Sequence, residues 1–315
     1  MKIIFAGSPE YAVPALDRIV QSGRDVVAVI TQPDKPAGRK KIMTPTPVKA
    51  YAVAHGIPVI DLPRIRTHVQ EVAAFAADLM ITCAYGQILS KELLDLFPSG
   101  VWNLHASLLP KLRGASPIQS AILEGFEYTG VTVMKTEEGL DTGDILLVKR
   151  IRIGNETCGE LSQKLSLLSA DAVTEALEYI ESGDTQLLIQ NEYSATYCKK
   201  VSKEDARLDF TLPAAEIIRR VKAYSPDPCA YCALNGTGLN ILNADLCPAE
   251  SSAGADEPDG TYKPGEVVRA DKKGIIVACG QGMICLTVLQ QAGGKAMKAA
   301  DFVNGRKIKA GDILE

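Results

Sequence analysis

The strongest indication of the fold is the stretch "KIIFAGSPEYAVPALDRIVQSGRDVVAVITQ", residues 2–32. Its two ends, KIIFA and DVVAVITQ, are apolar and rich in β-branched residues, which is typical of buried strands. The segment PALDRIVQSG between them has apolar residues at helical spacing and stops at Gly23. A strand, a helix and a second strand in this order predict a parallel sheet with helices on its faces.

The same alternation continues through the first half of the chain. Further apolar runs predict strands at residues 57–60, 78–84 and 101–105, then a strand pair at 129–136 and 144–153. A long helical pattern follows at 157–182. From residue 204 one helical pattern precedes several short strands with glycine-rich turns, which is typical of a small β-barrel.

These patterns predict an α/β fold in two parts. The first is a doubly wound, mostly parallel sheet, and the second is a smaller C-terminal β-barrel of the OB-like kind. The expected boundaries are a first domain at 1–186, a linker at 187–203 and the barrel domain at 204–315.

Length and composition are those of an ordinary globular protein, with 315 residues, 46% hydrophobic and 23% charged. No apolar run approaches the ~20 residues that a membrane-spanning helix needs, so no membrane partner is expected. The eight cysteines form no disulfide framework, which favours free thiols and a cytoplasmic location. Cys229 and Cys232 have no further ligands nearby, so no metal site is expected.

The formal net charge of −4 conceals two basic regions. Residues 34–49 contain five Lys or Arg and one Asp, and residues 263–315 contain nine Lys or Arg and five acidic residues. Local basic patches are what contact with phosphates requires, although a solvated surface explains each patch equally well.

The stretch "VWNLHASLLPKLRG", residues 101–114, contains the main site candidate. Side chains alternate along a strand, so Asn103 and His105 point to the same face. Two polar groups there need partners, because a buried amide or imidazole without a hydrogen bond is costly. His105 also stands at the carboxyl end of a predicted strand, where ligands bind in open α/β sheets. A histidine satisfied within the core is the alternative.

A second candidate is Asp141 in "GLDTGD", residues 139–144. The glycines on both sides permit tight turns, which could bring the carboxylate against an imidazole and orient its ring. An ordinary acidic turn is the alternative. An aspartic protease, which uses the same D-T-G letters, needs two such motifs, and this chain has one. The chain also lacks the G-x-G-x-x-G, Walker and G-x-S-x-G motifs.

The stretches "NLHASLLPKLRGASPIQSAILEG" and "TGVTVMKTEEGLDTGDIL" strongly resemble the formyltransferases that use 10-formyltetrahydrofolate. The shared pattern is Asn-x-His at a strand end, Ser-Leu-Leu-Pro, and an Asp in a D-T-G-D loop. The stretches "FAGSPEYAVPAL", "TQPDKPAGRKKIMTPTPVKAYA", "KPGEVVRADKKGIIVACG" and "QQAGGKAMKAADFVNG" resemble in particular the members that formylate methionyl-tRNA. The resemblance therefore runs almost end to end.

The resemblance implies roles for individual positions. The catalytic residues it implies are Asn103, His105 and Asp141. The folate-contacting residues it implies are Ser107, Leu108, Leu109, Pro110, Tyr85 and Gly86, and the tRNA-contacting ones are Arg39, Lys40 and Lys41. Some members have a glycine between this arginine and the lysines, and this chain does not, so its loop contacts can be placed differently.

The resemblance also implies a reaction and its partners. The formyl group of 10-formyltetrahydrofolate, a co-substrate, would pass to the α-amino group of initiator methionyl-tRNA without a metal, in a monomeric enzyme that serves translation initiation. An N-formyltransferase for a nucleotide-linked amino sugar is the alternative within the same family. A folate-dependent hydrolase and a noncatalytic RNA-binding module are more distant alternatives.

Overall fold

The computed structural model describes residues 1–38, 40–247, 262–305 and 307–315. The chain divides into two compact units, each built from more than one stretch of sequence. The first unit comprises Met1–Pro117, Tyr128–Arg152 and Ser162–Lys199, and the second comprises Ile118–Glu127, Ile153–Leu161 and Lys200–Glu315.

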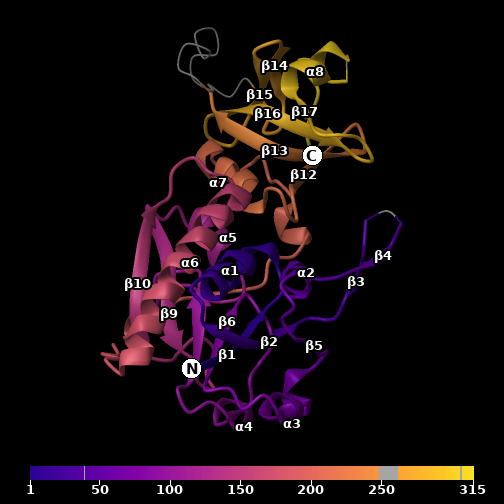
Figure 1. The fold of residues 1–315 in the computed structure, drawn as a ribbon. Coiled ribbons are helices and arrows are strands. Elements are labelled where there is room, and N and C mark those ends of the chain that lie inside the picture. The colour runs from indigo at the N-terminus through magenta and orange to yellow at the C-terminus, as the bar shows by residue number, and fades with distance from the viewer. Residues whose placement is uncertain (39, 248–261, 306) are drawn as a thin grey trace. The chain divides into compact units, whose positions relative to one another are not determined.

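The first unit is built on a seven-stranded sheet, drawn from indigo to pink in Figure 1. Its strands in spatial order are β10 (Ile145–Arg152), β9 (Tyr128–Lys135), β7 (Val101–His105), β6 (Leu79–Cys83), β1 (Lys2–Gly7), β2 (Asp25–Thr31) and β5 (Val59–Asp61). The five strands from β7 to β5 are parallel, and β9 pairs antiparallel with β7 on one side and with β10 on the other. The predicted, mostly parallel sheet is confirmed.

Helices and short strands connect and cover this sheet. The helices of this unit that begin in the first half of the chain are η1 (Glu10–Ala12), α1 (Val13–Gln21), α2 (Pro47–Ala54), η2 (Ile65–Thr67), α3 (Val69–Ala73) and α4 (Lys91–Leu94). They are followed by α6 (Cys158–Ser182) and η3 (Glu192–Ser194). Two short strand pairs complete the unit: β3 (Lys35–Ala37) with β4 (Ile42–Thr44), and β8 (Arg113–Gly114) with β11 (Tyr197–Cys198).

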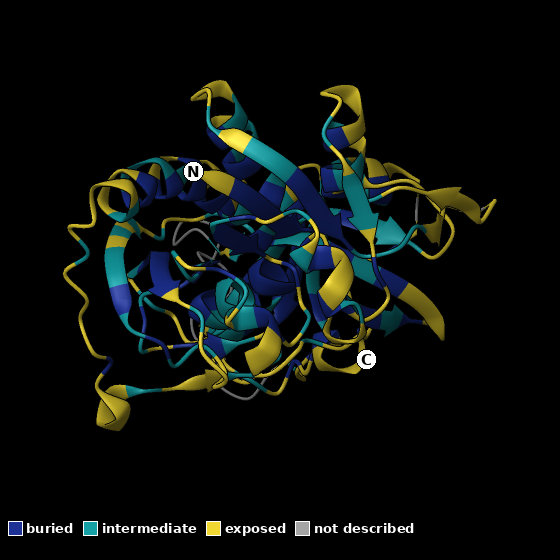
Figure 2. Cartoon of the chain, turned by 60° about the horizontal axis from the view of Figure 1, so that its bottom comes forward, coloured by how far each residue is buried: buried dark blue, intermediate teal, exposed yellow. Residues whose placement is uncertain are grey.

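Strand alternation assigns the buried side chains to the two faces of the sheet. Ile4 packs in a core cluster with residues from α3 and α4, whereas its neighbour Ile3, also fully buried, points to the opposite face. Figure 2 shows the central strands as a dark blue, buried band. Val101 of β7 belongs to the same cluster as Ile4, so Asn103 and His105, two and four residues further on, share that face.

The second unit contains an antiparallel sheet in the spatial order β12 (Ala230–Leu234), β13 (Thr237–Leu246), β16 (Met283–Gln291), β15 (Gly274–Ala278) and β14 (Val267–Asp271), with β17 (Met297–Lys298) beside β16. Its helices are α5 (Pro117–Leu123), which belongs to this unit from Ile118 on, η4 (Glu204–Ala206), α7 (Ala214–Tyr224) and α8 (Ala299–Asn304). The chain end joins the two outer strands. Glu315 exchanges backbone hydrogen bonds with Ala233, and Leu314 N donates to Gly265 O. This contact closes the sheet, as expected of a small barrel.

The barrel has its own apolar core, in which α7 contributes Ile217 and Val221. Their neighbours in this core include Ile241, Ile275 and Leu286, all without exposed surface.

Within the described part of the chain, no helix combines the length and the apolar character needed to cross a membrane.

Candidate active site

The amide of Asn103 lies beside a hydroxyl group on the neighbouring strand. Thr82 of β6 pairs with Asn103 of β7 in the parallel register, and its Oγ1 donates a hydrogen bond of 2.9 Å to Asn103 Oδ1. In this arrangement the oxygen end of the amide faces the Thr82 hydroxyl, which leaves Nδ2 available as a donor. Asn103 is half-buried at the end of the sheet face that it shares with Thr82 and His105, so its NH₂ group is placed to meet a ligand oxygen.

His105 ends β7 and is 6% exposed. Its Nε2 lies 2.9 Å from the carbonyl oxygen of Leu112, which can only accept, so Nε2 carries a proton and donates it. Its Nδ1 lies 3.6 Å from Oδ2 of Asp141. Because one ring nitrogen is held by the backbone, Nδ1 is the atom that can exchange a proton with a substrate.

Asp141 reaches His105 from the loop between β9 and β10. Its φ of +54° is a backbone conformation that L-residues rarely adopt, and it turns the carboxylate back over the sheet. The backbone N of Gly114 donates a hydrogen bond of 2.8 Å to Asp141 Oδ2. Only glycine fits at 114, because φ is +118° and a Cβ would lie 2.3 Å from the carbonyl oxygen of Cys198. The structure thus brings the three predicted catalytic residues together.

The backbone of the Asp141 loop is held from another side by Gln190. Its Nε2 donates to the carbonyl oxygens of Asp141, at 2.8 Å, and of Gly143, at 2.7 Å. Gln190 lies in segment 187–203, which the sequence suggests as a linker, and residues 187–199 of this segment belong to the first unit.

The Ser107–Leu108–Leu109–Pro110 loop folds back onto the sheet, mainly through Thr132. The Thr132 hydroxyl donates to Ser107 O at 2.7 Å and accepts from Leu109 N at 3.2 Å. Leu109 packs against Met134 and Ile145, and Ser107 is fully buried. Leu108 and Pro110 are half-buried. Of the four predicted folate contacts in this loop, these two have side-chain surface to offer a ligand.

Tyr85 and Gly86 follow β6, the strand beside β7. The Tyr85 ring is 5% exposed and belongs to the core cluster, and its hydroxyl has no hydrogen-bond partner among the described residues. This burial raises the pKa of the Tyr85 phenol. Gly86 has a φ of +74°, and Ile88, two residues on, is 78% exposed. A ligand here would meet the backbone and Ile88 rather than the Tyr85 ring.

The basic segment 34–49 forms the β3–β4 hairpin, which extends away from the sheet in Figure 1. Lys40 and Lys41 at its turn are exposed, and Arg39 lies outside the described residues. Lys49 is different, because its Nζ lies 2.8 Å from Asp34 Oδ1 and 2.7 Å from Asp61 Oδ2. The charge available to a partner therefore comes from the hairpin itself and not from Lys49.

Two family models match this chain. Residues 1–177 match the model described as "Formyl transferase", and residues 200–307 match "Formyl transferase, C-terminal domain". The chain belongs to the formyltransferase family. Among curated proteins, this formyltransferase is 41% identical to the methionyl-tRNA formyltransferase of Lachnospira eligens, over 100% of the chain and 99% of that relative. It is also 41% identical to the methionyl-tRNA formyltransferase of Bacillus subtilis, over 99% and 97%.

Solved structures agree with the fold of this formyltransferase. The N-formyltransferase from Helicobacter canadensis, in complex with folinic acid and dTDP-3-aminofucose, superposes with a TM-score of 0.66. The match covers 91% of this chain and 98% of that protein, at 18% sequence identity. At this identity the likeness extends to the fold alone.

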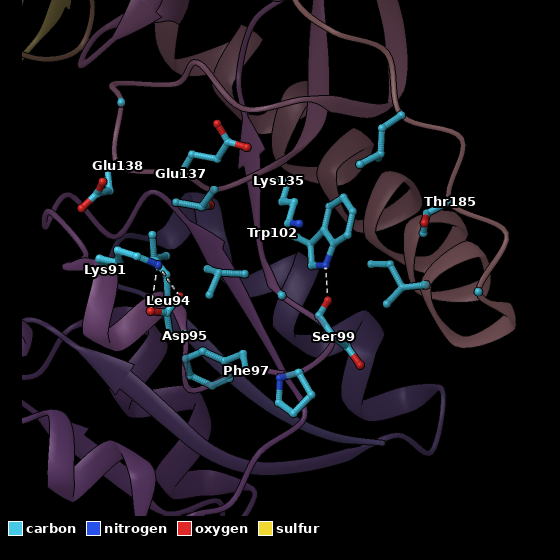
Figure 3. Close-up of a pocket in the computed structure, with 18 residues that line it drawn as sticks. Lys91, Leu94, Asp95, Phe97, Ser99, Trp102, Lys135, Glu137, Glu138 and Thr185 are labelled. Carbon is cyan, nitrogen blue, oxygen red and sulfur yellow. Dashed lines mark hydrogen bonds and ion pairs between the residues drawn. The ribbon is translucent and has the colours of Figure 1, made fainter.

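A separate pocket of about 880 Å³ lies at the start of β7 in this formyltransferase. Figure 3 shows Trp102 at its wall, donating from Nε1 to Ser99 O at 2.9 Å, and the Lys91–Asp95 ion pair at its rim. None of the predicted catalytic or folate residues lines this pocket. Trp102 and Asn103 are consecutive in β7, so their side chains point to opposite faces.

Three contributors to the Asn103–His105–Asp141 cluster were not predicted from the sequence: Thr82, Gly114 and Gln190. A polar residue within the apolar run of β6 was a usable signal for Thr82, and Gly114 is the last residue of the quoted stretch 101–114. The sequence around Gln190 has no period and gave no signal. Within the described ranges, no group of three or more His, Cys, Asp or Glu side chains is arranged to hold a metal ion.

Proposed function

We propose that this formyltransferase transfers the formyl group of 10-formyltetrahydrofolate to the α-amino group of methionyl-tRNA. The observation that carries the proposal is the 41% identity to curated methionyl-tRNA formyltransferases over essentially the whole chain. This sequence similarity covers both the sheet unit and the barrel unit. The geometry around Asn103, His105 and Asp141 suits the same reaction.

Asn103 stabilises the oxygen that becomes negative when the amine attacks the formyl carbon. Because Thr82 holds Oδ1, the Nδ2 group of Asn103 faces the reaction as a donor. A preorganised donor of this kind is usually worth ~10²–10³ in rate.

His105 moves the proton, and Asp141 holds His105 in place. Nδ1 takes the proton that the attacking amine must lose and passes it to the folate nitrogen as the formyl C–N bond breaks. The co-substrate supplies the formyl carbon, and one C–N bond forms for the one that is broken. The Asp141 carboxylate, 3.6 Å from Nδ1, orients the ring and stabilises it while it carries the extra proton.

Folate fits the loops that follow β6 and β7, two neighbouring parallel strands. We assign its binding to Leu108 and Pro110, whose side chains are partly exposed, and to the backbone at Tyr85 and Gly86. Ser107 and Leu109 support this site from within.

The acceptor in this proposal is initiator methionyl-tRNA, bound by a monomer. Lys40 and Lys41 contact the tRNA backbone, since exposed cations on an extended hairpin suit phosphate contact. Arg39 is assigned the same role on the family resemblance alone. We assign residues 1–186 to the catalytic domain, 187–203 to a linker whose residues 187–199 pack in the first unit, and 204–315 to a tRNA-binding barrel domain.

The test is a formylation assay with purified full-length protein. Incubation with 10-formyltetrahydrofolate and charged initiator tRNA should give methionine with a blocked amine, and His105→Ala should reduce the product to background while the thermal unfolding midpoint stays near that of the wild type. A parallel reaction offers a dTDP-linked amino sugar. Formylation of the sugar but not of the tRNA would replace this proposal with the alternative N-formyltransferase.

A further inference from the structure

We propose that Gln190 is a positioning residue that sets the place of Asp141 against His105. The inference rests on the proposed function, because it concerns the same site. Gln190 is 5% exposed, lies 49 residues after Asp141 in the chain, and does not touch the imidazole in any recorded contact. It acts on the backbone that carries the carboxylate.

The Asp141 loop needs such support. It contains Gly139 and Gly143, and Asp141 itself has a left-handed φ, so the loop conformation is intrinsically unfavourable. Both N–H groups of the Gln190 amide are used on this loop, one on each of two carbonyl oxygens at 2.8 and 2.7 Å. A single side chain thus ties the backbone of Asp141 to that of Gly143.

The orientation of the Gln190 amide is itself fixed by Arg113. The Nε and Nη2 groups of Arg113 donate to Gln190 Oε1 at 3.0 and 2.8 Å. The oxygen must therefore face the guanidinium, and the NH₂ group must face the two carbonyls. The amide cannot rotate by half a turn without placing donor against donor and acceptor against acceptor.

Arg113 is fully buried, which requires compensation for its charge. Glu192 provides it with two oxygens, 2.8 Å from Nη1 and 2.7 Å from Nη2, and the Tyr197 hydroxyl lies 3.2 Å from Nη1. The next residue, Gly114, donates its N–H to the Asp141 carboxylate. The same short strand therefore supports both the carboxylate and, through Gln190, the loop backbone.

Gln190→Glu tests the hydrogen bonds to the Asp141 loop without changing the size of the side chain. Glutamate has nearly the same shape and still accepts from Arg113, but it loses both N–H donors and faces the two carbonyls with a carboxylate oxygen. We expect kcat to fall about 10- to 100-fold, the effect of a small displacement of a reacting group, while KM for folate and tRNA changes little. Gln163→Glu, the same change at an exposed position of α6, should leave both constants unchanged.

A spectroscopic measurement tests the position of Asp141 directly. The chain has only three histidines, so the ¹⁵N spectrum of histidine-labelled protein contains three imidazoles, and His105→Ala identifies the relevant one. In Gln190→Glu, and to a smaller extent in Glu192→Gln, the His105 Nδ1 signal should move in the direction that Asp141→Asn moves it. The signals of His55 and His68 should stay in place.

A normal kcat in Gln190→Glu would overturn the inference. A loss of activity without a shift of the His105 signal would also overturn it, because Gln190 would then support only the fold. If Gln190→Glu does not fold, Glu192→Gln decides by the same signal, because that carboxylate is largely exposed. A wild-type protein that formylates no tRNA would instead refute the proposed function, and the ¹⁵N comparison would still test whether Gln190 positions Asp141.

Discussion

The hydroxyl of Thr82 donates a 2.9 Å hydrogen bond to Oδ1 of Asn103, across the pair of strands that ends at the candidate active site. An asparagine amide can present either end to a ligand, and the two ends are opposite in character. With Oδ1 directed at Thr82, Nδ2 is the end of the Asn103 amide that can donate toward the site, and stabilisation of an oxyanion requires such a donor.

Thr82→Val removes that bond with little change in volume. The Asn103 amide then loses its fixed orientation, and we expect kcat to fall about fivefold, the equivalent of ~1 kcal/mol for one hydrogen bond. Thr129→Val is the matched control, since Thr129 is also buried in a strand but its hydroxyl has no partner among the described residues. Steady-state formylation kinetics measure both. Equal activity of the two variants would contradict the role of Thr82.

Asp141→Asn keeps the acceptor for Gly114 N–H but removes the negative charge beside His105. Without that charge the imidazole is less able to carry the proton in transit, and we expect kcat to fall by ~10²–10⁴, the usual range for proton transfer by a positioned group. Single-turnover kinetics with saturating folate isolate this step. Asp95→Asn, an exposed carboxylate paired with Lys91, should behave as wild type. A fully active Asp141→Asn enzyme would exclude the proposed role.

Periodic features of the molecule could be predicted from the sequence. The alternation of strands and helices predicts the sheet, and the two-residue period of β7 places Asn103 and His105 on one face. The approach of Asp141 to His105 was suggested by the glycines around Asp141 and implied by the family resemblance, but no periodic pattern predicts it. It depends on a left-handed φ at Asp141 and on a glycine at 114 that a strand carbonyl crowds, and neither has a periodic signature.

Arg113 and Gln190 illustrate what a single sequence conceals. An arginine in a loop is normally an exposed residue, yet Arg113 is fully buried because Gln190 and Glu192, both distant in sequence, satisfy its donors. Gln190 lies in a stretch without apolar periodicity, so nothing local indicates that it packs against the Asp141 loop. Its proposed role depends on hydrogen bonds to Arg113 and to the Asp141 loop, which exist only in the folded chain.

Lys40→Ala and Lys41→Ala should weaken the use of tRNA and spare the use of folate. Each lost phosphate contact should raise KM for tRNA several-fold and reduce the slope of log affinity against log salt by ~0.7–0.9. Kinetics at a series of salt concentrations measure both quantities. Lys91→Ala, which removes an exposed charge from α4, is the control and should leave the slope unchanged. Equal effects on KM for tRNA and for folate would contradict tRNA contact by the hairpin.

Glu192→Gln should destabilise the protein in a pH-dependent way. The hydrogen bonds from Arg113 lower the pKa of Glu192 below its usual 4.5, so the ionised carboxylate is favoured in the folded state. A carboxylate whose pKa is lower in the folded than in the unfolded protein stabilises the folded state fully at a pH above its pKa in the unfolded chain. This stabilisation is lost as the pH falls through its pKa in the folded protein. The unfolding midpoint of Glu192→Gln should therefore lie below that of the wild type at pH 7, and the difference should shrink as the pH falls below about 4.5. A difference that stays constant from pH 7 to pH 3 would show that the charge of Glu192 does not matter to the buried Arg113, and that the carboxylate serves only as a neutral acceptor.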